Sequence, residues 1–350
     1  MALRKENTGK HIIRWIAGFV ILAMFIIAFI FYNKIYGSNI QVTSGSDTYL
    51  YVPDSSNYKE LLINLENNHL VKRIQDFEWA ASVLHFGKVI KAGKYRLHDG
   101  MSNKQLIRKI QLGDQEQVML VLHNLRLKEN LAGYVSHKLE ADSLSILALL
   151  NDSNFVSSFG YTPANSYTMI LPNTYSFKWN TTAKDFIKRM YNESEHFWTP
   201  ARLDMANEAG ISKIQAVILA SIVNQESNRI DEMPIIAGVY LNRLHKGIKL
   251  DADPTVIFAN NDFTIRRVTR KYLIKDSPYN TYMYAGLPPG PITMPSMQAI
   301  KAVLHYQKSD YLFFCAKDDF SGHHAFAVTH AEHIINAHKF QKALDERNIH

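Results

Sequence analysis

Residues 214–227 read IQAVILASIVNQES and have the spacing of a helix. Ser212 lies just before them, and Gln215 follows it three residues later, which is the spacing of a capping box at a helix start. Apolar residues then recur at helical spacing, so the pattern predicts a helix with one broad apolar face. These residues are Ile214, Val217, Ile218, Leu219, Ile222 and Val223.

One carboxylate, Glu226, falls on this apolar face. It lies four residues after Ile222, so the two side chains share one side of the helix near its end. Desolvation disfavours the charged form of a carboxylate and raises its pKa, which is the property that a general acid needs near neutral pH. The alternative is a glutamate that turns back to solvent at the helix end, and the spacing alone leaves both interpretations open.

Three further blocks follow this helix. Residues 235–244 have helical spacing between Pro234 and Gly247. Asp253 precedes a proline, which is the pattern of a helix N-cap followed by a first-turn proline. Residues 277–292, SPYNTYMYAGLPPGPI, contain four prolines and two glycines and predict a stiff extended loop. Its tyrosine and asparagine side chains suit the apolar faces and hydroxyl rim of a sugar.

The series of blocks resembles the YceG-like (MltG) family of endolytic murein transglycosylases. The order and spacing of five blocks match, and the resemblance covers nearly everything beyond the N-terminal apolar run. It implies cleavage of the glycan strands of peptidoglycan, with Glu226 in the position of the catalytic glutamate. The blocks are SIVNQE (221–226), GVYLNRL (238–244), DPTVI (253–257), YNTY (279–282) and GLPPGPI (286–292).

We expect substrate to contact these blocks and a later Gly-His-x-Phe block, whose His324 either binds substrate or orients a loop. The stiff loop is expected to line the glycan cleft, so Asn280→Ala should lower turnover and leave the melting temperature nearly unchanged. The expected substrate-binding residues are Gln225, Asn242, Asp253, Thr255, Tyr279, Asn280, Tyr282, Pro289 and His324.

The chain departs from the family pattern at a few positions. Asn173, in the block LPNTYSF, stands where aspartate is usual, and Tyr167-Thr168 stand where the family has Glu-Gly. Asn224 stands where a second glutamate is common. These departures leave an alternative open, a catalytically degenerate scaffold protein that binds the cell wall through its small N-terminal domain. The retained Glu226 and the intact later blocks favour an enzyme.

The N-terminus predicts a membrane anchor. Residues 1–14 are polar and basic, and residues 15–32 carry no charge. At about 1.5 Å rise per residue, this run nearly spans a bilayer core of roughly 30 Å. A cleaved signal peptide is the alternative, but its apolar part is shorter and ends in small residues. We therefore predict an uncleaved anchor at 15–32 with a cytoplasmic N-terminus and the rest of the chain outside the cytoplasm. A polar tether follows at 33–46.

A small α/β unit is predicted at residues 47–115. It resembles the LysM-like domain of the same family, and GKYRLHDGMSNKQLIRKI (93–110) matches best. We expect this unit to touch glycan or to set the position of the enzyme, and a mere spacer is the alternative. Its predicted elements are strands at 48–52 and 93–97, helices at 57–67 and 76–84, and a helix that Ser102 and Gln105 cap and Gly113 ends.

Composition excludes some classes of function. The net charge of +7 includes +3 from the first 14 residues, and the rest is too diffuse for a nucleic-acid patch. The only cysteine, Cys315, lies in a predicted strand and is interpreted as an inert core thiol. The C-terminal histidines have neither His-Glu-x-x-His nor Cys/His-finger spacing, so no metal site is predicted. Strands at 311–317 and 324–328 and a helix from His330, capped by Thr329 and Glu332, are expected there.

The count of carboxylates bears on the product. Hydrolytic glycosidases commonly place two carboxylates across the scissile bond, whereas the matching blocks contain one well-placed glutamate. Asp253 is better explained as an N-cap, and position 224 is an amide. We therefore expect the C6 hydroxyl of N-acetylmuramic acid to attack within the substrate and to leave 1,6-anhydro ends. No metal or organic cofactor is implied.

The sequence thus predicts an α+β protein with a single N-terminal transmembrane helix, a LysM-like domain at 47–115 and a larger catalytic domain at 116–350. The resemblance implies a membrane-anchored lytic transglycosylase that cleaves the bond between N-acetylmuramic acid and N-acetylglucosamine in nascent strands. The implied partners are peptidoglycan glycan strands, the cytoplasmic (inner) membrane and peptidoglycan synthases, but not nucleic acid.

Overall fold

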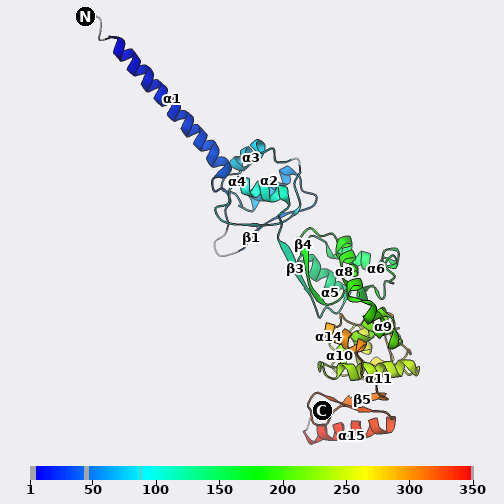
Figure 1. The fold of residues 1–350 in the computed structure, drawn as a ribbon. Coiled ribbons are helices and arrows are strands. Elements are labelled where there is room, and N and C mark those ends of the chain that lie inside the picture. Colours follow the sequence, from blue (N-terminus) through cyan, green and yellow to red (C-terminus); the bar gives the residue numbers. More distant parts are fainter. Residues whose placement is uncertain (1–4, 43–46, 88, 348–350) are drawn as a thin grey trace. The chain divides into compact units, whose positions relative to one another are not determined.

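The computed structural model describes residues 5–42, 47–87 and 89–347 (Figure 1). The chain divides into two compact units. The smaller unit comprises Met1–Val118 with Phe177–Asn180, and the larger comprises Met119–Ser176 with Thr181–His350. Helices and strands occur in both units, so the predicted α+β class is confirmed.

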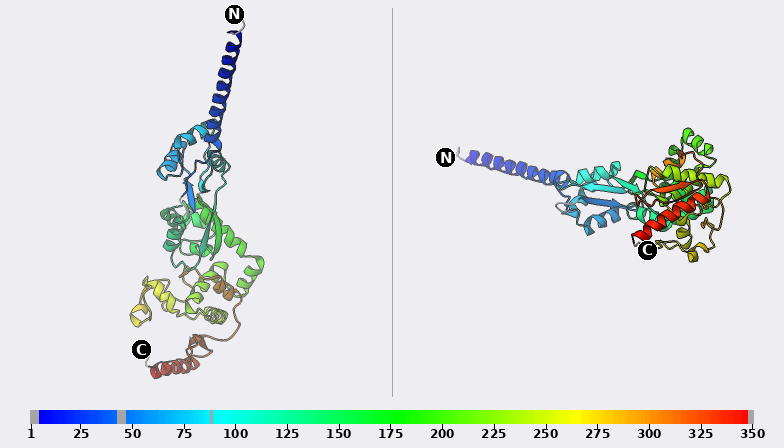
Figure 2. Two further views of the ribbon diagram at one scale, coloured as in Figure 1. Left: turned by 90° about the vertical axis from the view of Figure 1, so that its left-hand side faces the viewer. Right: turned by 90° about the horizontal axis from the view of Figure 1, so that it is seen from below.

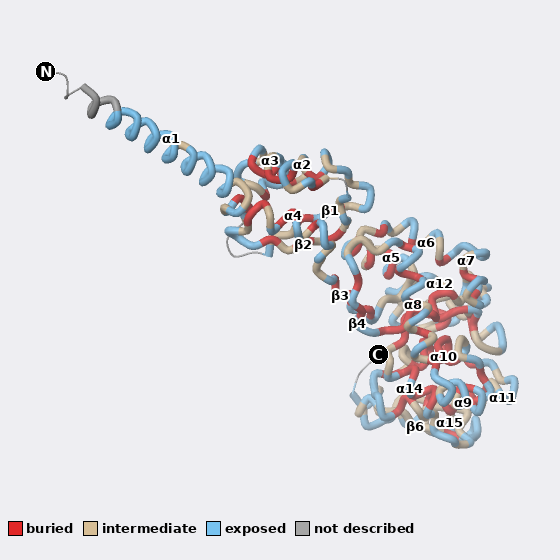
Figure 3. Tube along the Cα trace, turned by 45° about the horizontal axis from the view of Figure 1, so that its top comes forward, coloured by how far each residue is buried: buried red, intermediate tan, exposed pale blue. Residues whose placement is uncertain are grey.

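The N-terminal helix α1 (Lys5–Tyr36) is a single uninterrupted helix (Figure 2). An 18-residue window within its segment Lys10–Tyr36 has a mean hydropathy of 2.6, and none of this window is buried inside the protein (Figure 3). Within the described ranges it is the one helix that is long and apolar enough to cross a membrane. The run predicted to span the bilayer, 15–32, lies inside this helix.

The smaller unit is built around an antiparallel pair of strands that places Leu50 opposite Tyr95. Alternate side chains of both strands are buried, as expected for a sheet with one covered face. The capping box predicted at Ser102 and Gln105 is present, and Gly113 ends its helix in the left-handed conformation. The elements are β1 (Thr48–Val52), α2 (Tyr58–Asn67), α3 (Ile74–Val83), β2 (Gly93–Leu97) and α4 (Asn103–Leu112).

Residues 33–42 differ from the polar tether that their composition predicts. Lys34 lies in the last turn of α1 and forms an ion pair with Asp76 at 3.3 Å. Ile40 is fully buried in the core of the smaller unit. This segment therefore packs onto the smaller unit through the apolar side chain of Ile40. The sequence did not reveal this contact, because the residues next to Ile40 are polar. The remainder of the predicted tether, 43–46, lies outside the described residues.

Helices predominate from residue 117 onward. β3 pairs with β4, and β5 forms an antiparallel hairpin with β6. The first elements are β3 (Gln117–Leu122), α5 (Lys128–Ser136), α6 (Ser143–Asn151), α7 (Ser153–Ser157), the 3-10 helix η1 (Ser166–Met169), β4 (Asn173–Lys178), α8 (Ala183–Phe197) and α9 (Pro200–Glu208). The others are α10 (Lys213–Glu226), α11 (Met233–His245), α12 (Asp253–Asn260), α13 (Arg270–Leu273), α14 (Met297–Leu304), β5 (Phe313–Ala316), β6 (His324–Ala327) and α15 (His330–Glu346).

The helix α10 lies in the core of the larger unit. Its start carries the predicted capping box of Ser212 and Gln215. All residues from 216 to 223 are buried, so α10 is covered on every side rather than on the one face that the spacing predicts (Figure 3). The helices α9, α11, α12 and α14 pack around it. A helix buried all round is fixed along its length, which fixes the position of Glu226 at its end.

The C-terminal hairpin of β5 and β6 is covered by α15 (Figure 1). The predicted capping box of Thr329 and Glu332 opens α15. Cys315 is half-buried rather than a core thiol, because no residue of β5 is fully buried. Partial burial raises the pKa of the Cys315 thiol.

Candidate active site

Glu226, the last residue of α10, faces a cavity of about 430 Å³. The cavity lies within the larger unit. The ends of α10 and α11, the start of α12, β5 and the start of α15 all contribute side chains to it. The lining residues are Glu226, Tyr240, Arg243, Leu250, Asp251, Asp253, Tyr282, Leu312, Phe313, Phe314, His330 and His333.

Glu226 is held by one hydrogen bond and retains some exposure into the cavity. The Tyr240 hydroxyl donates to Glu226 Oε1 at 2.6 Å. Burial raises the pKa of Glu226 to about 7, the Tyr240 hydrogen bond lowers it, and the charge of Asp253 raises it further. The carboxyl therefore exists in both protonation states near neutral pH, as an acid–base catalyst requires.

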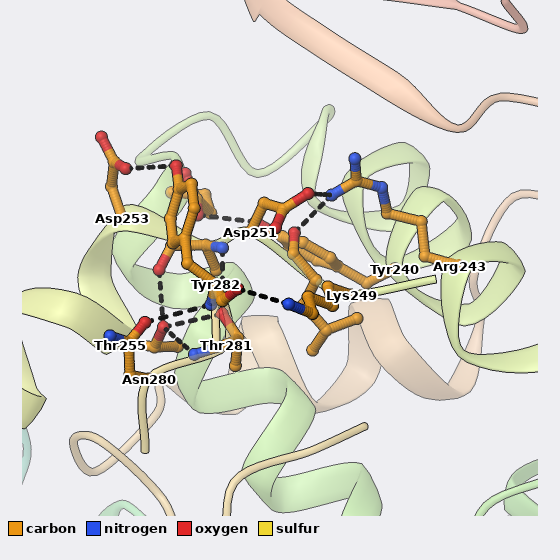
Figure 4. A network of polar contacts seen from close by, with 12 residues as sticks. Tyr240, Arg243, Lys249, Asp251, Asp253, Thr255, Asn280, Thr281 and Tyr282 are labelled. Carbon is orange, nitrogen blue, oxygen red and sulfur yellow. Dashed lines mark hydrogen bonds and ion pairs between the residues drawn. The ribbon is translucent and has the colours of Figure 1, made fainter. Parts of the chain in front are cut away.

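Asp253 is not the N-cap that its position before a proline predicts. Ala252 is the N-cap of α12, and Asp253 is the first residue of that helix. The Asp253 carboxylate accepts a hydrogen bond from the Tyr282 hydroxyl at 2.7 Å (Figure 4). This long-range contact draws the carboxylate away from the backbone N–H groups of α12 and towards the cavity. Asp253 therefore lines the same cavity as Glu226, although the sequence pattern assigns its carboxylate to the helix N-terminus.

A cationic side chain, Arg243, lines the same cavity. Its Nη1 donates to Leu250 O at 2.5 Å and lies 3.3 Å from Asp251 Oδ2 (Figure 4). The charge of Asp251 is thereby balanced. Over the part of the chain that the structure describes, Glu226 and Asp253 are the lining carboxylates without a cationic ion-pair partner.

The structure brings Glu226, Asp253 and Tyr282 together, but it places two other predicted site residues in structural roles. Thr255 is fully buried, and its Oγ1 donates to Ala252 O at 2.6 Å. Asn242 Nδ2 donates to two backbone carbonyls beyond α14, at 2.7 and 2.9 Å. These bonds fix the start of α12 and the approach to β5, and neither side chain lines the cavity.

The remaining predicted residues lie elsewhere. Gln225 and Tyr279 line two neighbouring cavities, and Pro289 is exposed. His324 Nδ1 lies 3.0 Å from Glu232 Oε2, and its backbone N–H donates to Glu232 Oε1 at 2.7 Å. Of the two roles expected for His324, this contact matches the orientation of a loop, since it joins β6 to the start of α11.

Asn280 is fully buried, so its predicted contact with substrate is wrong. Its Nδ2 donates to Leu273 O and Lys275 O, each at 2.8 Å, and its Oδ1 accepts from the Tyr282 N–H at 3.0 Å. Every polar atom of the side chain has a backbone partner within the protein. The sequence could not reveal this, because the same amide would suit either a sugar hydroxyl or a backbone carbonyl.

Asn280→Ala is therefore expected to reduce the free energy of unfolding by about 2–3 kcal/mol, because two carbonyls and one N–H lose a buried partner. Chemical denaturation of the full-length protein in detergent measures this. Asn192→Ala, at an exposed position in α8, serves as the control and should leave the unfolding midpoint nearly unchanged. A stable Asn280→Ala variant with slow turnover would restore the original expectation of a substrate contact.

Sequence reasoning missed several lining residues. Tyr240 and Arg243 lie in the block GVYLNRL, three residues apart and therefore on one face of α11. That spacing could identify them, whereas the family resemblance points to Asn242 in the same block. His333 packs against Phe313 at 5.5 Å between ring centroids, and burial lowers its pKa. Within residues 5–42, 47–87 and 89–347, no cluster of three or more His, Cys, Asp or Glu side chains is placed to bind a metal ion.

The departure at position 224 has a structural consequence. Asn224 Oδ1 accepts a hydrogen bond from the Ser296 N–H at 2.9 Å, just before α14. Asn224 is not among the residues that line the cavity of Glu226. The amide therefore stabilises the junction between α10 and α14, and the cavity does not depend on a carboxylate at this position.

Tyr240→Phe is expected to shift the pH dependence of activity. The hydrogen bond from Tyr240 lowers the pKa of Glu226, so its removal raises that pKa and moves the alkaline limb of the kcat/KM profile to higher pH. Rates measured between pH 5 and pH 9 test this. Tyr284→Phe, which removes an exposed hydroxyl bonded to Asp276, is the matched control. A shift to lower pH in Tyr240→Phe would contradict the assignment.

A half-buried glutamate with a pKa of about 7, in one cavity with a second carboxylate, makes this cavity a candidate acid–base site on an α+β fold. The chain belongs to the YceG-like family, whose family model matches residues 50–339. The resemblance predicted from the five sequence blocks is therefore confirmed.

The relatives agree with this assignment. An endolytic murein transglycosylase of Bacillus subtilis is 27% identical over 334 residues, which cover 90% of this chain and 91% of the relative. One of Streptococcus pneumoniae is 26% identical over 323 residues, which cover 81% of this chain and 57% of the relative. The crystal structure of a YceG-like protein from Listeria monocytogenes matches with a TM-score of 0.54 and 27% identity, over 83% of this chain and 99% of that one.

Proposed function

We propose that this chain is an endolytic lytic transglycosylase that cleaves peptidoglycan strands between N-acetylmuramic acid and N-acetylglucosamine. The observation that carries the proposal is the Glu226 carboxyl, whose pKa of about 7 leaves much of it protonated at neutral pH in an open cavity. Family membership and the names of the relatives support it. A carboxyl of this kind can protonate a glycosidic oxygen.

In the proposed reaction, Glu226 donates its proton to the oxygen that joins C1 of N-acetylmuramic acid to the next sugar. The C1–O bond breaks, and positive charge develops at C1. The C6 hydroxyl of the same muramyl residue attacks C1 and gives its proton to the Glu226 carboxylate. One new strand ends in 1,6-anhydro-N-acetylmuramic acid, the other begins with a free hydroxyl, and Glu226 is protonated again.

Asp253 has a supporting role in this proposal. Its carboxylate faces the same cavity, and the Tyr282 hydrogen bond fixes its position. A fixed negative charge stabilises the positive charge that develops at C1. The same charge raises the pKa of Glu226 and so favours its protonated form before the reaction.

A hydrolase is the second candidate, and the position of Asp253 favours it. Glycoside hydrolases usually have two catalytic carboxylates in one cavity, and the second one activates water or attacks C1. We prefer the transglycosylase because intramolecular attack by the C6 hydroxyl gains from proximity. The chemical nature of the new strand end separates the two reactions.

The alternative that is not an enzyme is a catalytically inactive scaffold protein that binds the cell wall. The pKa of Glu226 and the open cavity favour an enzyme. Incubation of the full-length protein in detergent with uncrosslinked glycan strands tests this. We expect strands of intermediate length to appear early, as endolytic cleavage requires. Strands that bind the protein but keep their length would support the scaffold.

We further propose that residues 1–14 lie in the cytoplasm, 15–32 span the inner membrane, 47–115 form a LysM-like domain that contacts glycan, and 116–350 form the catalytic domain outside the cytoplasm. The long apolar helix and the basic residues before it support this orientation. An enzyme anchored in this way meets newly made strands, so peptidoglycan synthases are proposed partners.

The anchor is expected to remain in the mature protein. The apolar helix continues to Tyr36 without a run of small residues that a signal peptidase would recognise. N-terminal sequencing of protein extracted from membranes should therefore find the original N-terminus, and the protein should stay in the membrane fraction after an alkaline wash. A new N-terminus after residue 32 would contradict the anchor.

A further inference from the structure

A second cavity of about 670 Å³ lies in the larger unit, next to the start of α5. Its lining includes two cations, Arg126 and Lys128, and a single carboxylate, Glu129, which is exposed. Aromatic side chains form part of its wall, and two of them, Phe258 and Tyr279, pack with ring centroids 4.7 Å apart. The proposed reaction does not use this cavity.

Arg126 has unused hydrogen-bonding capacity. Its Nη2 donates to Gln225 Oε1 at 3.0 Å, and its guanidinium carbon lies 4.5 Å from the centre of the Phe263 ring. Neither partner is charged. Within the described ranges these are the side-chain contacts of Arg126, so it has no ion-pair partner there and no further hydrogen bond occupies its other N–H groups. The remaining N–H groups of this guanidinium form a planar fork that can donate two hydrogen bonds to a carboxylate.

Lys128 adds a second fixed positive charge. Its Nζ donates to Asn151 Oδ1 at 2.9 Å and to the backbone oxygens of Leu150 and Pro163 at 3.3 and 2.5 Å. All three acceptors are neutral, so they orient the ammonium group without balancing its charge. Burial lowers the pKa of Lys128 because desolvation disfavours the charged form, and the charge of Glu129 opposes this shift. An anion in the cavity would supply the missing negative charge.

The cavity is related to the active site by residues that neighbour the active-site carboxylates in the sequence. Gln225, the partner of Arg126, directly precedes Glu226. Arg126 and Phe258 also line a small cavity of about 130 Å³, together with Gln225 and Pro254, the residue after Asp253. A small cavity lined by the sequence neighbours of Glu226 and Asp253 therefore shares Arg126 and Phe258 with the larger cavity.

We propose that this cavity binds the peptide stem of the muramyl residue by one of its carboxylates, an inference that rests on the proposed function. N-acetylmuramic acid in peptidoglycan carries a short peptide on its lactyl group, and that peptide ends in a carboxylate. Arg126 binds the carboxylate, Lys128 adds attraction, and the aromatic wall contacts aliphatic side chains of the stem. Binding the stem positions the adjacent glycosidic bond at Glu226, so the enzyme prefers strands that carry peptides.

The test compares strands that carry stems with the same strands after an amidase has removed them. The full-length protein in detergent should give a higher kcat/KM on the strands with stems. The preference for stems is the kcat/KM on strands with stems divided by the kcat/KM on strands without them. Arg126→Gln should lower this ratio about tenfold, the scale of one charge-assisted contact. Arg126→Lys, which keeps the charge but not the fork, should give an intermediate ratio. Arg267→Gln, which removes a charge from an exposed position, should keep the original ratio.

Binding is measured separately in the background of Glu226→Gln, with fluorescently labelled strands that carry stems. Arg126→Gln should weaken this binding, and Arg267→Gln should not. If the variants form product with an unchanged ratio and bind equally well, the stem site is wrong and the proposed function stands. If the original protein forms no product while binding still depends on Arg126, the proposed function is wrong and the stem site stands.

Discussion

Replacement of Glu226 by glutamine is expected to reduce the rate of glycan cleavage about 10³-fold, the scale of a general acid–base residue. An amide cannot donate a proton to the glycosidic oxygen or accept one from the C6 hydroxyl. Glu226 is the lining carboxyl whose pKa of about 7 suits both steps. Initial rates of the full-length protein on uncrosslinked strands measure the loss.

The fold should survive this substitution. Glutamine Oε1 can still accept the hydrogen bond from Tyr240, so the unfolding midpoint should change little. Glu208→Gln, at an exposed position at the end of α9, controls for the loss of one negative charge and should keep full activity. An active, folded Glu226→Gln protein would overturn the assignment of the catalytic acid.

Asp253→Asn is expected to reduce kcat about 10²-fold, because the developing charge at C1 loses a fixed negative charge. The charge of Asp253 raises the pKa of Glu226, so its removal also lowers that pKa. The alkaline limb of the pH–rate profile should therefore move to lower pH, the opposite direction from Tyr240→Phe. Kinetics across the same pH range measure both effects.

Two controls define the role of Asp253. Asp204→Asn, on the exposed surface of α9, changes the same charge at a distance from the cavity and should have no effect. Tyr282→Phe removes the hydroxyl that positions the Asp253 carboxylate and should lower kcat by a smaller factor. Unchanged kinetics in Asp253→Asn would exclude a part for this carboxylate in the reaction.

Local sequence patterns predicted the helix starts and the position of Glu226. The capping boxes at Ser212 and Thr329 depend on residues only three positions away, and both are present. Glu226 could be identified because the periodicity of one helix places it beside apolar residues. Such features need no knowledge of the rest of the fold.

The sequence patterns failed where a partner came from a distant segment. Asp253 follows the N-cap pattern, but Tyr282, 29 residues later, supplies its hydrogen bond. Thr255 is buried against Thr281, 26 residues later. The resemblance predicts substrate contacts for residues of the matching blocks, although several of these residues join the blocks to one another. A polar side chain in such a block can contact substrate or can join two segments of the protein. Only its neighbours in the folded structure decide between these roles.

The mass of the new strand end distinguishes the proposed transglycosylase from a hydrolase. The full-length protein digests uncrosslinked strands in isotopically labelled water, and mass spectrometry identifies the fragment ends. We expect 1,6-anhydro-N-acetylmuramic acid ends, about 18 Da lighter than hydrolysis products and free of labelled oxygen, because no water is added. Reducing ends that carry oxygen from the labelled water as the main product would contradict the mechanism, even if Glu226 proved essential.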